Sequence, residues 1–146
     1  MADLHFGIDV AWQGTGKEGE GVVHAGGHEI LYSAPASMGG KGTGTSPEEL
    51  LLAGITACYS ATLFGILKRA GLSVEKVLVK TDGMVTGYPT EAKFSHLKVH
   101  PTIVGGDKAK LDEYVTKATV ARDRCFVGKT VAGNMVYDLG EVSVEE

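Results

Sequence analysis

The chain has 146 residues, of which 43% are hydrophobic and 22% are charged. This composition predicts one domain with a packed core, spanning residues 1–146, and argues against disorder. The formal net charge is −4 and no run of lysines or arginines forms a local patch, so nucleic acid is not an expected partner. The amino terminus has no basic region followed by an apolar stretch, so we expect a cytoplasmic protein whose two cysteines are made as thiols.

Strands joined by glycine-rich turns are predicted for the first part of the chain. Apolar and β-branched residues indicate strands over residues 4–12, 20–26 and 28–33. Together they predict a β-meander. A loop rich in Gly, Ser and Pro then covers residues 34–45.

A long helix is predicted to begin after this loop. Ser46 supplies an N-cap oxygen, Pro47 the pre-set φ of the first helical position, and Glu49 the carboxylate of a capping box. The helix should run to about Ala70, with Gly71 as its left-handed stop.

This helix has apolar residues on all sides. Residues 50–67 carry no charge, which is a length typical of a membrane span, but hydroxyl-bearing side chains interrupt the stretch. We therefore expect a buried helix of a soluble protein and no membrane association. A helix without a polar stripe either lies centrally in its domain or completes its burial against a second subunit. A homodimer is a reasonable hypothesis on this ground.

The rest of the chain continues with strands over residues 74–88 and 94–104, a helix over 107–122, a turn that begins at Cys125, and a strand over 131–144. The apolar residues expected on one face of the second helix are Leu111, Val115, Ala118 and Ala121. This order of elements predicts an α+β fold with mostly antiparallel sheets packed around the long central helix.

Two glycine-rich segments resemble nucleotide-binding loops, but their surroundings argue against that function. Residues 14–19 match the dinucleotide pattern, yet a strand rather than a helix follows them. Residues 128–130 resemble the end of a phosphate-binding loop, but a helix is predicted before them and a strand after them, whereas such a loop follows a strand and precedes a helix. The histidines also lack close metal-ligand spacing with the cysteines. Neither a cofactor nor a metal is expected.

The two cysteines are the candidate reactive groups. Cys58 lies in the middle of the long helix, where it is either an unreactive side chain of the core or a reactive thiol shielded from solvent. Burial raises the pKa of a thiol, so a reactive Cys58 needs a cation or a hydrogen-bond donor aimed at it. Cys125 follows Arg122 and Arg124, which either complement the end of a helix or favour a Cys125 thiolate. Only the fold can bring the cysteines within the roughly 6 Å between Cα atoms that a disulfide requires.

A family resemblance is carried by two short runs of sequence. They are Gly44-Thr45-Ser46-Pro47-Glu48-Glu49-Leu50, followed by Ala57-Cys58-Tyr59, and the later Arg124-Cys125-Phe126-Val127-Gly128. These runs, and the order of elements along nearly the whole chain, resemble the OsmC/Ohr family of osmotically inducible and organic hydroperoxide resistance proteins. The resemblance implies an intertwined homodimer of α+β subunits, with the long helices at its centre and the cysteines near the interface.

The resemblance also implies an activity, that of a thiol-dependent peroxidase for organic hydroperoxides in the oxidative stress response. Cys58 would attack the peroxide oxygen and become a sulfenic acid, and Cys125 would resolve it as a disulfide that a dithiol then reduces. Glu48 would orient a cation beside the Cys58 thiolate. It needs this bridging cation, or a partner chain, because the roughly ten residues that separate it from Cys58 advance a helix by about 15 Å.

One feature departs from the family pattern. Family members with peroxidase chemistry carry an arginine in the N-terminal strands or in the loop before the helix, whereas this chain has no arginine before Arg69. Lys17, Lys41, His24 or His28 could supply the cation, although an ammonium lacks the planar fork of a guanidinium. The alternative hypothesis is therefore a dimeric OsmC-like binding protein with weak or no peroxidase activity. Rapid alkylation of the first cysteine near neutral pH would favour the peroxidase.

Overall fold

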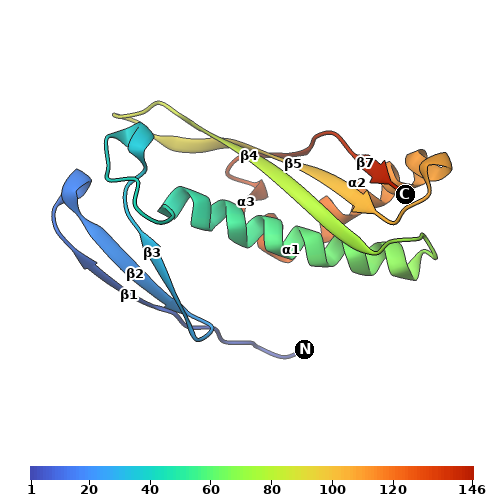
Figure 1. Cartoon of the computed structure of the whole chain (residues 1–146), viewed down its shortest axis with the longest axis horizontal. Helices are drawn as coiled ribbons and strands as arrows, with labels where there is room; N and C mark the ends of the chain where they lie inside the picture. The colour runs from blue at the N-terminus through green and yellow to red at the C-terminus, as the bar shows by residue number, and fades with distance from the viewer. The chain divides into compact units, whose positions relative to one another are not determined.

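The computed structural model describes all of residues 1–146, which divide into two compact units, residues 1–51 and residues 52–146. Each unit has its own β-sheet (Figure 1). The expectation of a single domain stays a prediction.

The first unit contains a three-stranded antiparallel sheet in the order β1-β2-β3. The strands are β1 (Asp9–Gln13), β2 (Glu20–Ala25) and β3 (His28–Tyr32). The predicted meander is confirmed, although β1 begins at Asp9 rather than at residue 4. The loop that matches the dinucleotide pattern connects β1 to β2 and contains a short 3₁₀ turn, Gly16–Glu18. It is a hairpin connection, as expected.

The helix α1 (Pro47–Arg69) begins and ends as predicted. The Glu49 N–H donates to Ser46 Oγ at 3.2 Å, and Ser46 Oγ donates to Glu49 Oε1 at 2.9 Å. This capping pair satisfies one of the free amides of the first turn. At the other end Gly71 takes the left-handed conformation with φ +73°, and the Leu72 N–H donates to the Leu67 carbonyl at 3.0 Å. Such a bond closes a Schellman-type stop.

The second unit contains a four-stranded sheet built on β5. Its strands are β4 (Lys76–Thr86), β5 (Lys93–Val104), β6 (Val136–Leu139) and β7 (Ser143–Glu145). β4 pairs antiparallel with β5, whereas β6 and β7 both pair parallel with β5. The mostly antiparallel prediction thus holds for the hairpin-connected strands. The last two strands are parallel because the chain crosses over through two helices before it returns to the sheet.

Two predictions for the last third of the chain are wrong. The helix α2 (Leu111–Arg124) is followed at once by α3 (Phe126–Ala132), where a turn and the start of a strand were predicted. The predicted strand over residues 131–144 is instead the separate β6 and β7. α3 contains three β-branched residues and a glycine, which all have low helix propensity. Its contacts with α2 and β6 override this local preference.

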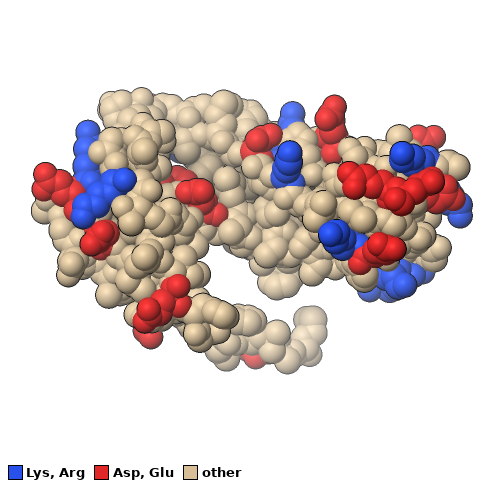
Figure 2. Space-filling view, in the orientation of Figure 1, with Lys and Arg blue, Asp and Glu red and all other residues tan.

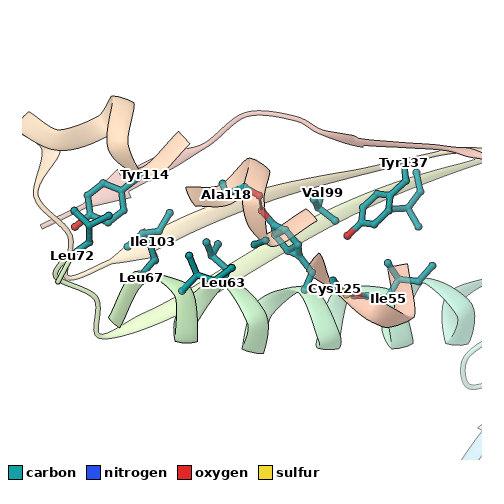
Figure 3. Packing of buried hydrophobic residues seen from close by; sticks show 14 residues of the cluster. Ile55, Leu63, Leu67, Leu72, Val99, Ile103, Tyr114, Ala118, Cys125 and Tyr137 are labelled. Carbon is teal, nitrogen blue, oxygen red and sulfur yellow. Dashed lines mark hydrogen bonds between the residues drawn. The ribbon is translucent and has the colours of Figure 1, made fainter. Parts of the chain in front are cut away.

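The core of the second unit forms where α1, β5 and α2 meet (Figure 3). On β5 the alternate side chains of Leu97, Val99 and Ile103 are buried, as expected of a strand with one face against the core. The predicted buried face of α2 is partly wrong, because Leu111 and Val115 are 41% and 38% exposed. The buried residues of α2 are Tyr114, Ala118 and Ala121.

α1 is long and apolar enough to cross a membrane by length and composition alone. Core helices pass the same test, and one side of α1 lies in the core of the second unit. The buried residues of this side are Ile55, Tyr59, Leu63, Ile66 and Leu67. Another side remains exposed, and its exposed residues include Ala53, Ala57, Ala61 and Phe64. Within the second unit, therefore, α1 is covered on one side only.

Charged side chains of both signs are interspersed on the face shown in Figure 2. Several form surface ion pairs, such as Lys41 with Glu20 at 3.4 Å and Arg122 with Asp123 at 2.9 Å. Exposed pairs of this kind contribute at most about 1 kcal/mol each. The fold therefore depends on its apolar core rather than on these pairs.

The hydroxyl of Tyr114 ties α2 to the rest of the second unit. It donates to the Ser73 carbonyl at 2.7 Å and accepts from the Asp107 N–H at 3.2 Å. We expect Tyr114→Phe to lower the free energy of unfolding by about 1–3 kcal/mol, because it leaves two backbone groups without a partner. Urea unfolding measures this loss. Tyr32→Phe is the control, since the Tyr32 hydroxyl makes no hydrogen bond, and an equal loss in both variants would contradict the prediction.

Candidate functional site

The structure brings together Cys58 of α1 and Cys125 of the junction between α2 and α3. Both are free thiols. Cys125 is fully buried, whereas Cys58 is half-buried. The two thiols lie close enough for each to shift the pKa of the other. Cysteines that are far apart in the sequence thus form one pair within the second unit.

The backbone at Cys125 explains how this thiol is positioned. Cys125 ends α2 and begins α3, with an extended conformation at φ −63° and ψ 108°. Its N–H donates to the Ala121 carbonyl at 2.9 Å, and its own carbonyl accepts from the Lys129 N–H at 2.9 Å. The first amides of a helix have no acceptor within that helix. The amides of Phe126 and Val127 therefore remain free to donate to the sulfurs.

Hydrogen bonds from neutral groups lower the pKa of Cys58. Burial is the largest single influence and raises the pKa, but the donors together outweigh it. The donors are the Cys125 thiol, the Val127 N–H, the Thr62 hydroxyl and the Phe126 N–H. Hydrogen bonds to the charged form favour that form. Cys58 therefore has the aimed donors that a reactive thiolate requires, and none of them is a cation.

The pKa of Cys125 moves in the opposite direction. Burial first, and then the hydrogen bond and the charge of Cys58, raise the pKa of this thiol to about 11. The hypothesis that Arg122 and Arg124 favour a Cys125 thiolate is therefore wrong. The Arg122 guanidinium instead donates to Asp123 Oδ1 at 2.9 Å. The Sγ atom of Cys125 also lies 3.9 Å from the Ile55 carbonyl oxygen, to which its S–H can donate. An ionised Cys58 sulfur is a stronger acceptor for this S–H than the carbonyl.

Two tyrosines lie close to the cysteine pair. Burial raises the pKa of both Tyr59 and Tyr137, and a negative charge on Cys125 raises each further. The Tyr59 hydroxyl donates to the Ala118 carbonyl at 2.9 Å (Figure 3). The Tyr137 hydroxyl is buried and has no hydrogen-bond partner.

Glu48 lies in the first turn of α1, in the unit of residues 1–51. Its Oε1 atom is buried and has no hydrogen-bond partner, and no salt bridge joins it to a basic side chain. Two of the candidate cations pair elsewhere: Lys41 lies 3.4 Å from Glu20, and His24 lies 3.3 Å from Glu29. A role for Glu48 beside the thiolate therefore stays a prediction.

The donors that lower the pKa of Cys58 are not among the residues predicted from the sequence. Thr62 follows Cys58 by one helical turn, a spacing that places both on one side of α1. This signal was available. The amides of Phe126 and Val127 could not be found without α3, which was not predicted. No group of three or more His, Cys, Asp or Glu side chains is placed to hold a metal ion.

Comparisons with known proteins agree on one family. Residues 40–139 match the family described as OsmC-like protein. The uncharacterized protein YmaD of Bacillus subtilis (strain 168) is 30% identical over 150 residues, which cover 99% of this chain and 97% of YmaD. Among solved structures, an OsmC-like protein of unknown function from Vibrio cholerae has a TM-score of 0.79 at 16% identity, covering 96% of this chain and 99% of that one. An organic hydroperoxide resistance protein OsmC from Legionella pneumophila has a TM-score of 0.72 at 22% identity, covering 99% and 100%.

The Thr62 hydroxyl offers a test of how the Cys58 thiolate is stabilised. We expect Thr62→Val to slow the alkylation of Cys58 by iodoacetamide at pH 7 roughly three- to tenfold, because the thiolate loses a donor and the pKa of Cys58 rises. Thr62→Ser keeps the hydroxyl and should retain the parental rate. Mass spectrometry of the alkylated peptides over a pH series measures Cys58 and Cys125 separately. Equal rates for the valine and serine variants would contradict the assignment.

Proposed function

Because the chain belongs to the OsmC-like protein family, we propose that it is a thiol-dependent peroxidase that reduces organic hydroperoxides. The observation that carries this proposal is the opposite direction of the two thiol pKa values. The pKa of Cys58 is lowered, and that of Cys125 is raised to about 11. A two-cysteine peroxidase needs an ionised sulfur for attack and a protonated one held beside it. The name of the Legionella relative agrees with this substrate class.

The proposed reaction has two steps on the protein. The Cys58 thiolate attacks the terminal oxygen of the hydroperoxide, the O–O bond breaks, and the alkoxide leaves and takes up a proton as an alcohol. Cys58 is then a sulfenic acid. In the second step the sulfur of Cys125 forms a bond to that of Cys58, the S–O bond breaks, and the hydroxide leaves as water with the proton of Cys125. A dithiol reduces the resulting disulfide by thiol–disulfide exchange.

The surroundings of the pair support an organic substrate over hydrogen peroxide. Cys58 and Cys125 lie in or against an apolar cluster that includes Ile55 and Val127. Phe126, next to Cys125, is 71% exposed. Apolar groups at the site favour a substrate with an apolar body through the hydrophobic effect. Hydrogen peroxide has no such part.

Glu48 has a proposed role as a positioning residue. A buried carboxylate oxygen without a partner is unfavourable, and Glu48 Oε1 is such an atom. We propose that Glu48 orients a cation, which a lysine or histidine of this chain or of a second copy supplies. Since neutral donors already lower the pKa of Cys58, this cation would assist the departing alkoxide more than the ionisation of the thiol.

We also propose that the protein is a homodimer. The support is the apolar side of α1 that one chain leaves exposed, at Ala53, Ala57, Ala61 and Phe64. Small residues on one side of a helix allow a second helix to approach closely, and apolar area removed from water supplies the driving force. A second copy of α1 is the occupant of this side that the family resemblance implies.

A binding protein with weak peroxidase activity is the second candidate function. The chain has no arginine before Arg69, and Glu48 has no partner. A dimer that retained an apolar cleft but lost strong thiol activation would have these features. The two candidates differ in what a hydroperoxide does to the thiols.

Loss of thiols on addition of a hydroperoxide tests the peroxidase directly. With one equivalent of cumene hydroperoxide, we expect the parent to lose both thiols rapidly, and to react more slowly with hydrogen peroxide. Cys58→Ser should abolish the loss, and Cys125→Ser should stop at a trappable sulfenic acid, because each removes one of the two steps. Free thiol per chain measures the outcome. Thiols that survive for many minutes in the parent would leave the binding protein as the better candidate.

The apolar side of α1 offers a test of the dimer. We expect Ala57→Asp to shift the protein from dimer to monomer, because it would bury an unpaired charge at the interface. Ala109→Asp is the matched control, since Ala109 is also exposed but lies outside α1. Light scattering coupled to size-exclusion chromatography gives the mass of each variant. If the unsubstituted protein has the mass of a monomer, the homodimer proposal is wrong.

A further inference from the structure

Tyr137 has the only buried side-chain polar atom in the unit of residues 52–146 that lacks a hydrogen-bond partner. Its side chain is 9% exposed, and its hydroxyl oxygen is buried. Buried tyrosine hydroxyls usually find a partner. The reduced protein therefore holds a donor whose acceptor is missing, beside the pair of reactive thiols.

The ring of Tyr137 is held in place by β6 and α3. On β6, Tyr137 lies opposite Leu97 of β5 in the sheet. On α3, a Cβ atom at Gly128 would meet Tyr137 Cε2, so only glycine lets the ring lie this close to the helix. The same segment of α3 provides the amides that donate to the sulfurs. Figure 3 shows the hydroxyl directed away from β6, toward the side of the cluster where Ile55 and Cys125 lie.

The electrostatic surroundings keep this hydroxyl protonated. Burial raises the pKa of Tyr137, and a negative charge on Cys125 or Cys58 raises it further. A phenol whose pKa is raised above its ordinary value near 10 is neutral at physiological pH and acts as a hydrogen-bond donor. Both sulfurs are close enough for their charge to act on it. Yet Tyr137 is not among the groups that donate to the sulfur of Cys58.

We propose that the Tyr137 hydroxyl donates a hydrogen bond to the oxygen atom that Cys58 acquires from the hydroperoxide. The inference rests on the proposed peroxidase function. The oxygen of the Cys58 sulfenic acid extends beyond the sulfur and would be the first acceptor available to this hydroxyl. When Cys125 attacks, the S–S bond forms, the S–O bond breaks, and negative charge develops on the departing oxygen. The hydroxyl stabilises that charge without losing its proton, and the departing hydroxide takes its proton from Cys125 to leave as water.

Tyr137→Phe tests this role because it removes the hydroxyl and keeps the ring. With one equivalent of cumene hydroperoxide, we expect the variant to form the Cys58–Cys125 disulfide about tenfold more slowly than the parent. The reason is that its transition state lacks one charge-assisted hydrogen bond. Dimedone should trap more sulfenic acid, and more Cys58 should proceed to sulfinic acid. The alkylation rate of reduced Cys58 should be unchanged. Tm of the reduced protein should not fall, since the hydroxyl has no partner there.

Tyr114→Phe is the matched control, because Tyr114 is a fully buried tyrosine whose hydroxyl has partners away from the thiols. It should lower Tm and leave the rate of disulfide formation unchanged. If the parent forms the disulfide and Tyr137→Phe forms it equally fast, the role of Tyr137 is overturned while the peroxidase stands. If Tyr137→Phe lowers Tm as Tyr114→Phe does, the hydroxyl is structural and the inference is also overturned. If the parent loses no thiol, both proposals fall.

Discussion

The close pairing of the Cys58 and Cys125 thiols is the interaction on which the candidate chemistry depends, and the core of the second unit makes it possible. α1 carries one cysteine, and the junction of α2 and α3 carries the other. Both sulfurs lie in or against the same apolar cluster, in which Tyr59 of α1 donates to the Ala118 carbonyl of α2. Side chains in a close-packed core are held in defined conformations. The opposite pKa directions of the two thiols follow from this fixed arrangement.

Neutral donors give the site an electrostatic character different from that of a thiolate beside an arginine. The donors to Cys58 are a thiol, a hydroxyl and backbone amides, and these carry no net charge for salt to screen. Two of them are backbone amides, which among substitutions only proline removes. The absence of an arginine before Arg69 therefore does not by itself leave Cys58 without stabilisation of its ionised form.

The parts of the fold that local chemistry determines were predictable from the sequence. The Ser46 cap and the Gly71 stop gave the limits of α1 because each satisfies backbone groups within a few residues. The alternation of buried and exposed residues on β5 has a different local cause, the two-residue period of an extended strand. α3 was missed because its β-branched residues and its glycine have low helix propensity, and its contacts with α2 and β6 stabilise it as a helix. In the site, both cysteines were identified, whereas the amides of Phe126 and Val127 and the hydroxyl of Tyr137 depend on that unpredicted helix.

The difference in exposure between the two cysteines has a consequence for how the proposed disulfide would be reduced. Cys125 is fully buried, whereas Cys58 is half-buried. Exchange requires the attacking thiolate to reach a sulfur of the disulfide. In the proposed cycle an external dithiol would therefore attack the sulfur of Cys58, form its mixed disulfide there, and release Cys125 as a buried thiol. In this proposed cycle the oxidant and the reductant would react at the same sulfur atom, and neither could react while the other was bound to it.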